Sequence, residues 1–348
     1  MGMTSRERLL TAIRGGRPDR VPVAPWGFAR VDMHSALGQE LLARTDPFVN
    51  IGLGCDPIGG AAWPLESWIE GPVRRLRLRL ADRELTAAHT TTAQTTAATE
   101  YLCKSADDLR AVLAAPYVEP QPDGAAFRAL QAEIAGRGLV ILGFGTALNF
   151  LHDALGPALC CQLWAEDPEL LKWAANIAGQ RIARVVARAC EGGVDCLRLY
   201  GGEYATELMG PRAWQALVVV HDQPLVALIQ AHGAIAHYHN HGRMARWIEA
   251  IAALGVDSLD PIEQPPYGDL AMGEAWRRVG DRVCLVGGLD DMEVLDTRSW
   301  AEIEPLARQV LESVGRMRFI LGGTSSSLFG ERGARHFMRL AELAAEYS

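Results

Sequence analysis

The segment AIAHYHNHG at residues 234–242 joins an apolar run to three histidines at alternate positions. A β-strand points every second side chain to one face, so His237, His239 and His241 are expected on the same side of one strand. A glycine follows, and residues 243–254 have a helical pattern, which puts the histidines at the carboxyl end of that strand. Parallel α/β folds bind ligands at that end, and imidazole is a common metal ligand. The segment predicts a metal or catalytic site; alternatively, one or two of these histidines are hydrogen-bonded core residues.

Strand and helix patterns alternate on both sides of this segment. Apolar stretches with glycine or polar residues at their ends predict further strands near residues 18–24, 50–53, 139–142, 195–200, 257–259, 283–286 and 319–321. The longest helical pattern covers residues 168–191, and the last covers residues 332–347. Eight strand–helix units close a barrel, so the sequence predicts an α/β protein with a (β/α)8 TIM barrel. A doubly wound open sheet is the alternative.

Two features lie outside the eight units. Thr4 and Glu7 form a capping-box pattern, which predicts an N-terminal helical extension to about Arg14. In residues 74–101, leucines alternate with arginines before a polar turn and a threonine-rich stretch. This period of two predicts an inserted, solvent-facing β-hairpin. We assign residues 1–348 to a single barrel domain that carries both additions.

Composition excludes several classes of function. The 348 residues are 49% hydrophobic and 22% charged, as in a globular protein with a sizeable core. The net charge of −8 and the absence of a Lys/Arg-rich block argue against nucleic acid as a partner. No apolar run reaches membrane-spanning length, and the seven cysteines show no Cys-x-x-Cys spacing, which favours the cytoplasm. The hairpin edge is a possible surface for a homodimer.

Several short motifs resemble the uroporphyrinogen decarboxylase superfamily. They are TSRER at residues 4–8, PDRVPV at 18–23, the His239-x-His241-Gly242 turn, LGVD at 254–257 and GDRV at 280–283. Their order and spacing extend the resemblance over nearly the whole chain. The resemblance implies a (β/α)8 barrel and one of two chemistries. One is metal-free decarboxylation of uroporphyrinogen, and the other is zinc-dependent methyl transfer between a methylated corrinoid protein and a thiol.

The decarboxylase branch of the superfamily fits this chain poorly. Its arginine-rich N-terminal signature has no counterpart after residues 25–28, and its late Gly-His-Gly turn is replaced by GGTS at residues 322–325. The many carboxylates of uroporphyrinogen need bidentate arginine partners. We therefore do not expect uroporphyrinogen III to be the substrate.

The methyltransferase branch, which includes methylcobamide:coenzyme M methyltransferases, fits better. Its zinc ligands are a His-x-Cys pair and a later Cys. Here His239 aligns with the histidine, His241 replaces the first cysteine, and Thr324 or Ser325 stands at the position of the last one. Two imidazoles without a thiolate make a harder site, which would accept a carboxylate.

Two glutamates are candidates for that carboxylate. Glu263 follows the strand after the histidine strand and is the preferred third ligand; alternatively it caps a helix or pairs with an arginine. Glu203 follows the preceding strand and is the other candidate, with a hydrogen bond to a histidine as its alternative role. His237 is a further possibility, but we expect it to orient its neighbours from the barrel interior or to contact substrate.

Other polar residues are expected at the same barrel mouth. Glu203, Asp56 and Tyr204 are the candidate catalytic groups, although a helix cap is the preferred role for Asp56. Asn149 and His152 begin a helix that faces the mouth, and we expect them to contact a small-molecule substrate.

These residues lead to one preferred function and two alternatives. A divalent metal, with zinc expected, would be held by His239, His241 and a carboxylate, and would activate a thiol. The thiolate would attack a methyl group from a corrinoid on a partner protein or from a methylated small molecule. The alternatives are a metal-dependent decarboxylase or other lyase for a small carboxylated substrate, and a non-catalytic barrel that binds corrinoid or metal.

Overall fold

A closed barrel of eight parallel strands forms the centre of the computed structural model, which describes residues 2–92, 95–324 and 328–347. Neighbouring strands follow the order β1-β12-β11-β10-β9-β8-β7-β2. The strands are β1 (Val23–Ala24), β2 (Phe48–Gly52), β7 (Leu139–Gly145), β8 (Cys196–Tyr200), β9 (Ile235–His239), β10 (Ser258–Ile262), β11 (Cys284–Leu289) and β12 (Phe319–Gly323). The Gly27 amide donates to the Phe48 carbonyl at 2.7 Å, which joins the first strand to the second. The predicted TIM barrel is confirmed, and the open sheet is excluded.

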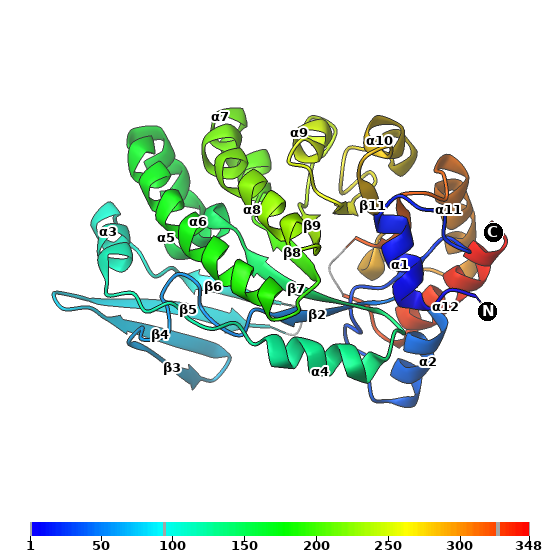
Figure 1. Cartoon of the computed structure of the whole chain (residues 1–348), viewed down its shortest axis with the longest axis horizontal. Coiled ribbons are helices and arrows are strands. Elements are labelled where there is room, and N and C mark those ends of the chain that lie inside the picture. The colour runs from blue at the N-terminus through cyan, green and yellow to red at the C-terminus, as the bar shows by residue number, and fades with distance from the viewer. Residues whose placement is uncertain (1, 93–94, 325–327, 348) are drawn as a thin grey trace.

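Helices surround the barrel on the outside (Figure 1). They are α2 (Ala36–Arg44), α3 (Ala106–Ala114), α4 (Gly124–Ile134), α5 (Ala147–Glu166), α6 (Pro168–Glu191), α7 (Pro211–Ala213), α8 (Val220–Ala231), α9 (Ile248–Ala252), α10 (Met272–Val279), α11 (Trp300–Ser313) and α12 (Glu331–Ala345). Wider π-helical segments cover Ala205–Met209, Trp214–Val219 and Asp291–Leu295. The helix expected over residues 243–254 is shorter than its pattern, since only Ile248–Ala252 is helical.

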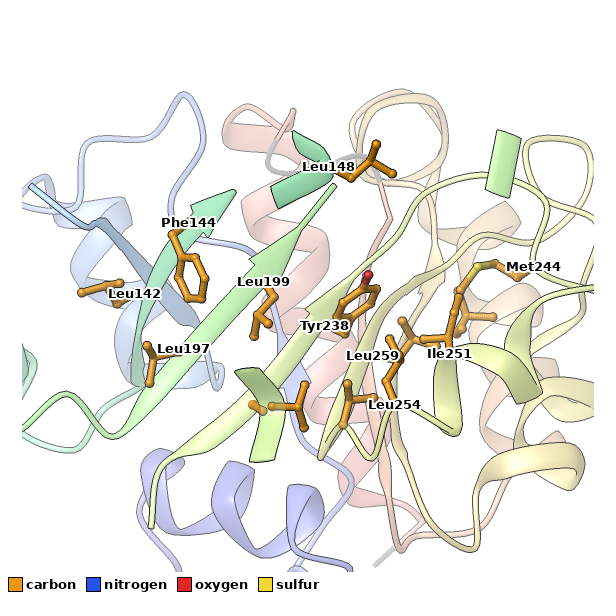
Figure 2. Close-up of a cluster of buried hydrophobic side chains, with 14 of the residues drawn as sticks. Leu142, Phe144, Leu148, Leu197, Leu199, Tyr238, Met244, Ile251, Leu254 and Leu259 are labelled. Atoms are coloured by element: carbon orange, nitrogen blue, oxygen red, sulfur yellow. The ribbon is translucent and has the colours of Figure 1, made fainter. Parts of the chain in front are cut away.

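The alternation of side chains along the strands divides the core into two parts. Outward-facing residues pack beneath the helices, as Figure 2 shows for Leu142 and Phe144 of β7, Leu199 of β8 and Tyr238 of β9. The residues between them point into the barrel. Burial on both faces explains why these strands have nearly continuous apolar sequences.

Helix α1 (Ser5–Ile13) closes the amino-terminal end of the barrel. Its Leu9, Ala12 and Ile13 are buried in one cluster with residues that begin the strands, among them Leu139 and Ile235. The predicted capping box is present, because Thr4 accepts a hydrogen bond from the Glu7 amide and the Glu7 carboxylate accepts one from the Thr4 amide. With this end closed, the carboxyl end of the barrel is the side open to ligands.

The insertion is larger than predicted. The range expected for the hairpin, residues 74–101, holds three strands, β4 (Val73–Arg79), β5 (Glu84–Thr91) and β6 (Thr96–Glu100), and β3 (Leu65–Glu70) completes a four-stranded antiparallel sheet. This sheet lies at the opposite end of the molecule from α11 and α12 (Figure 1). Strand β3 has little apolar alternation, because most of its side chains are exposed. Its sequence therefore carries no clear strand signal.

In the described parts of the chain, no helix has both the length and the apolar character needed to span a membrane. The assignment of all 348 residues to one domain stays a prediction.

Replacing Ile13 by Ala should lower the free energy of unfolding by about 2–5 kcal/mol, because it leaves a cavity at the closed end of the barrel. The matched control is Ile69→Ala on β3, whose side chain is 77% exposed; it should change that free energy by less than about 0.5 kcal/mol. Chemical denaturation of both variants measures the difference. Equal effects would contradict the role of α1, and separate unfolding transitions would contradict the single domain.

Candidate active site

A buried carboxylate organises the carboxyl end of the barrel. The strand register places Asp260 of β10 beside His239 of β9. Two residues earlier on β9, His237 lies beside Arg198 of β8. The Asp260 side chain is 1% exposed. It lies 2.5 Å from His237 Nε2, 3.0 Å from His239 Nδ1 and 2.9 Å from Arg198 Nη2. The carboxylate of Asp260 on β10 thus has hydrogen-bond partners on both β9 and β8.

The surroundings set the charges of this cluster. Burial alone would raise the pKa of Asp260, but Arg198 and the two histidines hold that pKa well below its usual range. Burial lowers the pKa of His239 to about 4, because it penalises the imidazolium more than Asp260 favours it. Asp260 is therefore an anion, and His239 is a neutral imidazole at physiological pH.

Two neighbours of His239 Nδ1 favour different tautomers of the ring. Asp260 accepts a hydrogen bond only if Nδ1 carries the proton, and that form leaves the lone pair on Nε2. Arg198 Nη2 lies 2.6 Å from the same Nδ1 and suits only the opposite form, in which Nδ1 accepts. The Arg198 guanidinium also stacks over Trp26 at 4.3 Å from the ring centroid. Any ligand that needs Nε2 as a donor atom therefore selects the hydrogen bond between His239 and Asp260.

His237 has an orienting role in the structure. Its ring is fully buried, and its Nδ1 lies 2.7 Å from Ser258 Oγ while its Nε2 faces Asp260. Both ring nitrogens are engaged by protein side chains. The expected substrate contact of His237 is therefore not supported, whereas its alternative role in the barrel interior is.

His241 and Glu263 form a second pair, at the rim of the barrel. His241 Nδ1 lies 3.2 Å from Glu263 Oε1, and the Gly242 amide donates to Glu263 Oε2 at 2.7 Å. Burial alone would lower the pKa of His241, but the hydrogen bond and the charge of Glu263 outweigh it and raise that pKa. Glu263 had been expected as a direct metal ligand; the structure places it where it orients His241.

The two histidines at the mouth lie at a spacing that suits one shared metal. The rings of His239 and His241 are nearly perpendicular, with centroids 4.6 Å apart. Two imidazoles on one zinc at about 2.0–2.1 Å would have centroids roughly 4.5–5.2 Å apart for angles of about 90–110°. Within residues 2–92, 95–324 and 328–347, no group of three or more His, Cys, Asp or Glu side chains is arranged to hold a metal. The candidate metal donors at the mouth are therefore two imidazoles, each with a carboxylate at Nδ1.

Glu203 lies close enough to His241 for their charges to interact. Its Oε2 accepts a hydrogen bond from the Gly201 amide at 3.0 Å, and burial raises its pKa. Glu203 is thus near the histidine pair, as expected from its place after β8.

A second group of predicted residues lines the mouth near β7 and β8. Asn149 Nδ2 donates to Asp153 Oδ2 at 2.7 Å on α5. His152, the residue before Asp153, stacks on Tyr204 with ring centroids 3.5 Å apart. The structure therefore brings Asn149, His152 and Tyr204 together, and it adds Asp153, which the sequence did not single out.

Asp56 serves the local backbone instead. Its Oδ1 accepts hydrogen bonds from the amides of Ile58 at 2.8 Å and Gly59 at 3.0 Å. This supports the capping alternative, and the role of Asp56 as an acid or base is not supported. Thr324 at the end of β12 is buried, and Ser325 lies outside the described residues.

Sequence reasoning missed Asp260 and Arg198, although a signal was present. Arg198 stands in the strand CLRLY and Asp260 in SLDPI, both otherwise apolar. A charged residue at an inward position of a buried strand needs a partner. Both positions match the histidine strand in register, but the register was not known from the sequence.

Comparisons with known proteins agree with this architecture. The chain matches the family model for uroporphyrinogen decarboxylase over residues 102–326. A sequence search finds no match among curated proteins. A methyltransferase from Methanosarcina mazei has a similar structure over 99% of this chain and 100% of its own, with a TM-score of 0.67 and 15% identity. A B12-independent methionine synthase from Shewanella sp. W3-18-1 covers 80% of this chain and 76% of its own, with a TM-score of 0.45 and 9% identity. At these identities, the likeness concerns the fold alone.

Replacing Asp260 by Asn should lower the free energy of unfolding by about 3–5 kcal/mol, because it leaves the charge of Arg198, whose side chain is 14% exposed, without its counterion. Asp281→Asn is the matched control, since that side chain is 82% exposed, and it should leave stability unchanged. Thermal and chemical unfolding of the two variants provide the measurement. A stable Asp260→Asn variant would mean that the carboxylate does not organise the barrel interior.

Proposed function

The chain belongs to the uroporphyrinogen decarboxylase family, and from this premise we propose that it is a metal-dependent methyltransferase. It moves a methyl group from a corrinoid or a methylated small molecule to a thiol-type acceptor. The observation that carries the proposal is the pairing of each mouth histidine with its own carboxylate. Asp260 faces Nδ1 of His239, and Glu263 faces Nδ1 of His241.

This pairing is the arrangement that metal-binding histidines commonly have in proteins. A carboxylate at Nδ1 fixes the tautomer and the orientation of the ring, so that Nε2 is the metal-binding nitrogen. His239 and His241 would hold the metal in this way. When bound, zinc or a similar divalent metal lowers the pKa of a coordinated thiol and supplies a thiolate at neutral pH.

The chain's own residues prepare the site for such a nucleophile. With a ligand on Nε2, the His239 proton would lie on Nδ1, where Asp260 accepts it, and the apolar barrel floor excludes water from below. The rim pair of His241 and Glu263 is more exposed, with 35% and 14% of the two side chains open to solvent. A methyl donor would approach from this open side, either free in solution or as a corrinoid on a partner protein docked over the mouth.

The arginine of the site bears on the choice between methyl transfer and decarboxylation. A carboxylated substrate needs a cationic partner. Arg198 is the arginine that contacts His239, with its Nη2 at 2.6 Å from Nδ1. That guanidinium is already ion-paired with Asp260. We therefore favour methyl transfer over the lyase alternative, and we do not expect conversion of uroporphyrinogen III.

The His239→Ala/His241→Ala double variant should lose its bound divalent metal and its methyl transfer to thiols while keeping its fold. Metal content of the purified protein, measured by mass spectrometry, checks the first effect, and circular dichroism checks the fold. His34→Ala, at a side chain that is 68% exposed, is the matched control and should keep the metal. Full metal content in the double variant would show that the two histidines are structural.

The metal affinity of the wild-type protein should depend on pH in a defined direction. A protonated imidazole cannot bind a metal, and the pKa of His241 lies above its ordinary value of 6.5. Metal affinity is therefore expected to fall as the pH drops, beginning above pH 6.5. Constant affinity across this range would argue against His241 as a ligand.

Replacing Glu263 by Gln should weaken metal binding by about 10- to 100-fold, because an amide holds the His241 ring less firmly than a carboxylate does. The control is Asp56→Asn, since Asp56 only caps a turn at Ile58 and Gly59, and it should leave the affinity unchanged. Competition with a chromogenic chelator gives both values. Equal affinities in the two variants would rule out an orienting role for Glu263.

A further inference from the structure

Strand β3 is a free edge of the inserted antiparallel sheet. The sheet has the order β3-β4-β5-β6, so within the described residues β3 pairs with β4 alone. In Figure 1, β3 lies at the outer border of this sheet. Its sequence, LESWIE at residues 65–70, contains no proline, and its register with β4 shows no bulge. Proline and bulges are two of the features that keep an edge strand from pairing with another strand. The edge of β3 is therefore open to a further strand.

The hydrogen bonds between β3 and β4 decide which residues face this edge. The Arg79 amide donates to the Pro64 carbonyl at 3.5 Å, and these two residues continue the register of the strand pair. In an antiparallel pair, every second residue of a strand is hydrogen-bonded to its neighbour. The even-numbered residues of β3 therefore face β4. Leu65, Ser67 and Ile69 direct their amide and carbonyl groups to the free edge.

The side chains of these three residues lie on one face of the sheet and carry no charge. Leu65 is 39% exposed, and Ile69 is 77% exposed, which is the highest value among the large hydrophobic side chains of the described residues. Ser67 lies between them and is exposed as well. Apolar side chains thus accompany open main-chain groups along one edge, which is the combination that favours pairing with another strand.

The charges of β3 lie on the other face and are compensated within the chain. Glu66 Oε1 accepts a hydrogen bond from Arg79 Nη1 at 2.6 Å, and Glu70 Oε2 accepts one from Arg75 Nε at 2.5 Å. Trp68, between the two glutamates, donates its indole N–H to Glu70 Oε1 at 2.7 Å. Neither carboxylate requires a cation from a partner. A neutral strand that matches the apolar face is therefore the kind of partner that this edge accepts.

We propose that a second copy of this chain covers the edge, through antiparallel pairing of β3 with its own copy around Ser67. A two-fold axis relates identical surfaces, so a strand that pairs with its own copy in a closed dimer must be antiparallel. The contact lies on the inserted sheet and not at the histidines, so it is independent of the proposed methyl transfer.

The register centred on Ser67 makes the edge complementary to itself. Residues 65–69 are then paired, with Leu65 opposite the partner's Ile69 on the apolar face. The Ser67 amide would donate to the carbonyl of the partner's Ser67, and the Ile69 amide to the carbonyl of the partner's Leu65. Symmetry provides each of these hydrogen bonds twice. The Leu65 amide would keep its present bond to the Trp63 carbonyl, at 2.8 Å.

The neighbouring registers are less favourable because they oppose like charges. A shift of the centre to Trp68 places Glu66 opposite the partner's Glu70, and a shift to Glu66 places that residue opposite itself. Like charges directly opposite each other destabilise a strand pair, whereas apolar pairs stabilise it. A centre between two residues would oppose a residue that faces the edge to one that faces β4. The sequence of β3 therefore selects Ser67 as the centre.

The oligomeric state of the wild-type protein is the first test. Sedimentation equilibrium from about 1 to about 100 μM should show a reversible monomer–dimer equilibrium, because one strand pair makes a smaller contact than a permanent interface does. A monomer throughout this range would overturn the proposal. This measurement does not depend on the folding of a variant.

A charge at the centre of the contact should disrupt it. Ser67→Lys should weaken dimerisation at least tenfold, because it places two ammonium groups opposite each other at the two-fold axis. The matched control is Ala97→Lys, which adds the same charge at an exposed position of β6, the other edge of the same sheet. It should dimerise like the wild type. Circular dichroism checks the fold of both variants, and equal dimerisation of the two would contradict pairing through β3.

Ile69→Ala separates the dimer contact from the stability of the monomer. It should weaken dimerisation, because the side chain loses its contact with the partner's Leu65. At a concentration at which the protein is monomeric, its free energy of unfolding should equal that of the wild type, since Ile69 is exposed in the monomer. Wild-type dimerisation of this variant would contradict the proposed pairing.

Cross-linking tests the register. Ser67→Cys should form a disulfide-linked dimer on mild oxidation, because opposite residues of a hydrogen-bonded pair have Cα atoms about 5.5 Å apart. Glu66→Cys is the control, since the two copies of that residue would be diagonal neighbours about 7–8 Å apart, beyond the reach of a disulfide. None of the native cysteines lies on β3. A non-reducing gel without a Ser67→Cys dimer, or with equal cross-linking of the two variants, would contradict the register.

Discussion

The ion pair between Asp260 and Arg198 is the constraint on which the open end of the barrel depends. An ionised carboxylate inside a barrel is costly unless several donors compensate it. The parallel register supplies those donors, because β8 and β9 place Arg198, His237 and His239 within reach of β10. Neither the carboxylate nor the guanidinium can be removed alone without leaving a buried charge. The stability of the carboxyl end of the barrel and the orientation of His239 are therefore consequences of one cluster.

This cluster also explains how the barrel interior is divided. Below it, apolar side chains and α1 fill and close the amino-terminal end. Above it, the side chains are polar, and His241 and Glu263 reach solvent. The closed end can contribute stability without taking part in chemistry, and the open end can vary its ligands without loss of the core. A TIM barrel separates stability from function in this manner.

The sequence predicted the barrel well because each parallel strand carries its own local signal, an apolar run with glycine or polar residues at its end. It predicted a hairpin over residues 74–101 from a different local signal, the alternation of leucines such as Leu78 with arginines; Leu78 is buried in the structure. It missed β3 because exposed side chains leave no alternation to detect. It found His239 and His241 from their spacing on one strand. Asp260, Arg198 and Asp153 were missed because their roles depend on contacts between strands, or between a strand and α5, that no local pattern encodes.

The charges at the barrel mouth determine which reactants it can accept. Glu203, Glu263 and Asp153 are acidic, and Arg198 is already compensated by Asp260. An anionic nucleophile such as a thiolate would be repelled from this surface unless a cation stood beside it. A metal between His239 and His241 would supply that cation. The same surface charge disfavours a carboxylated substrate, because its carboxylate would meet the same repulsion without a metal beside it.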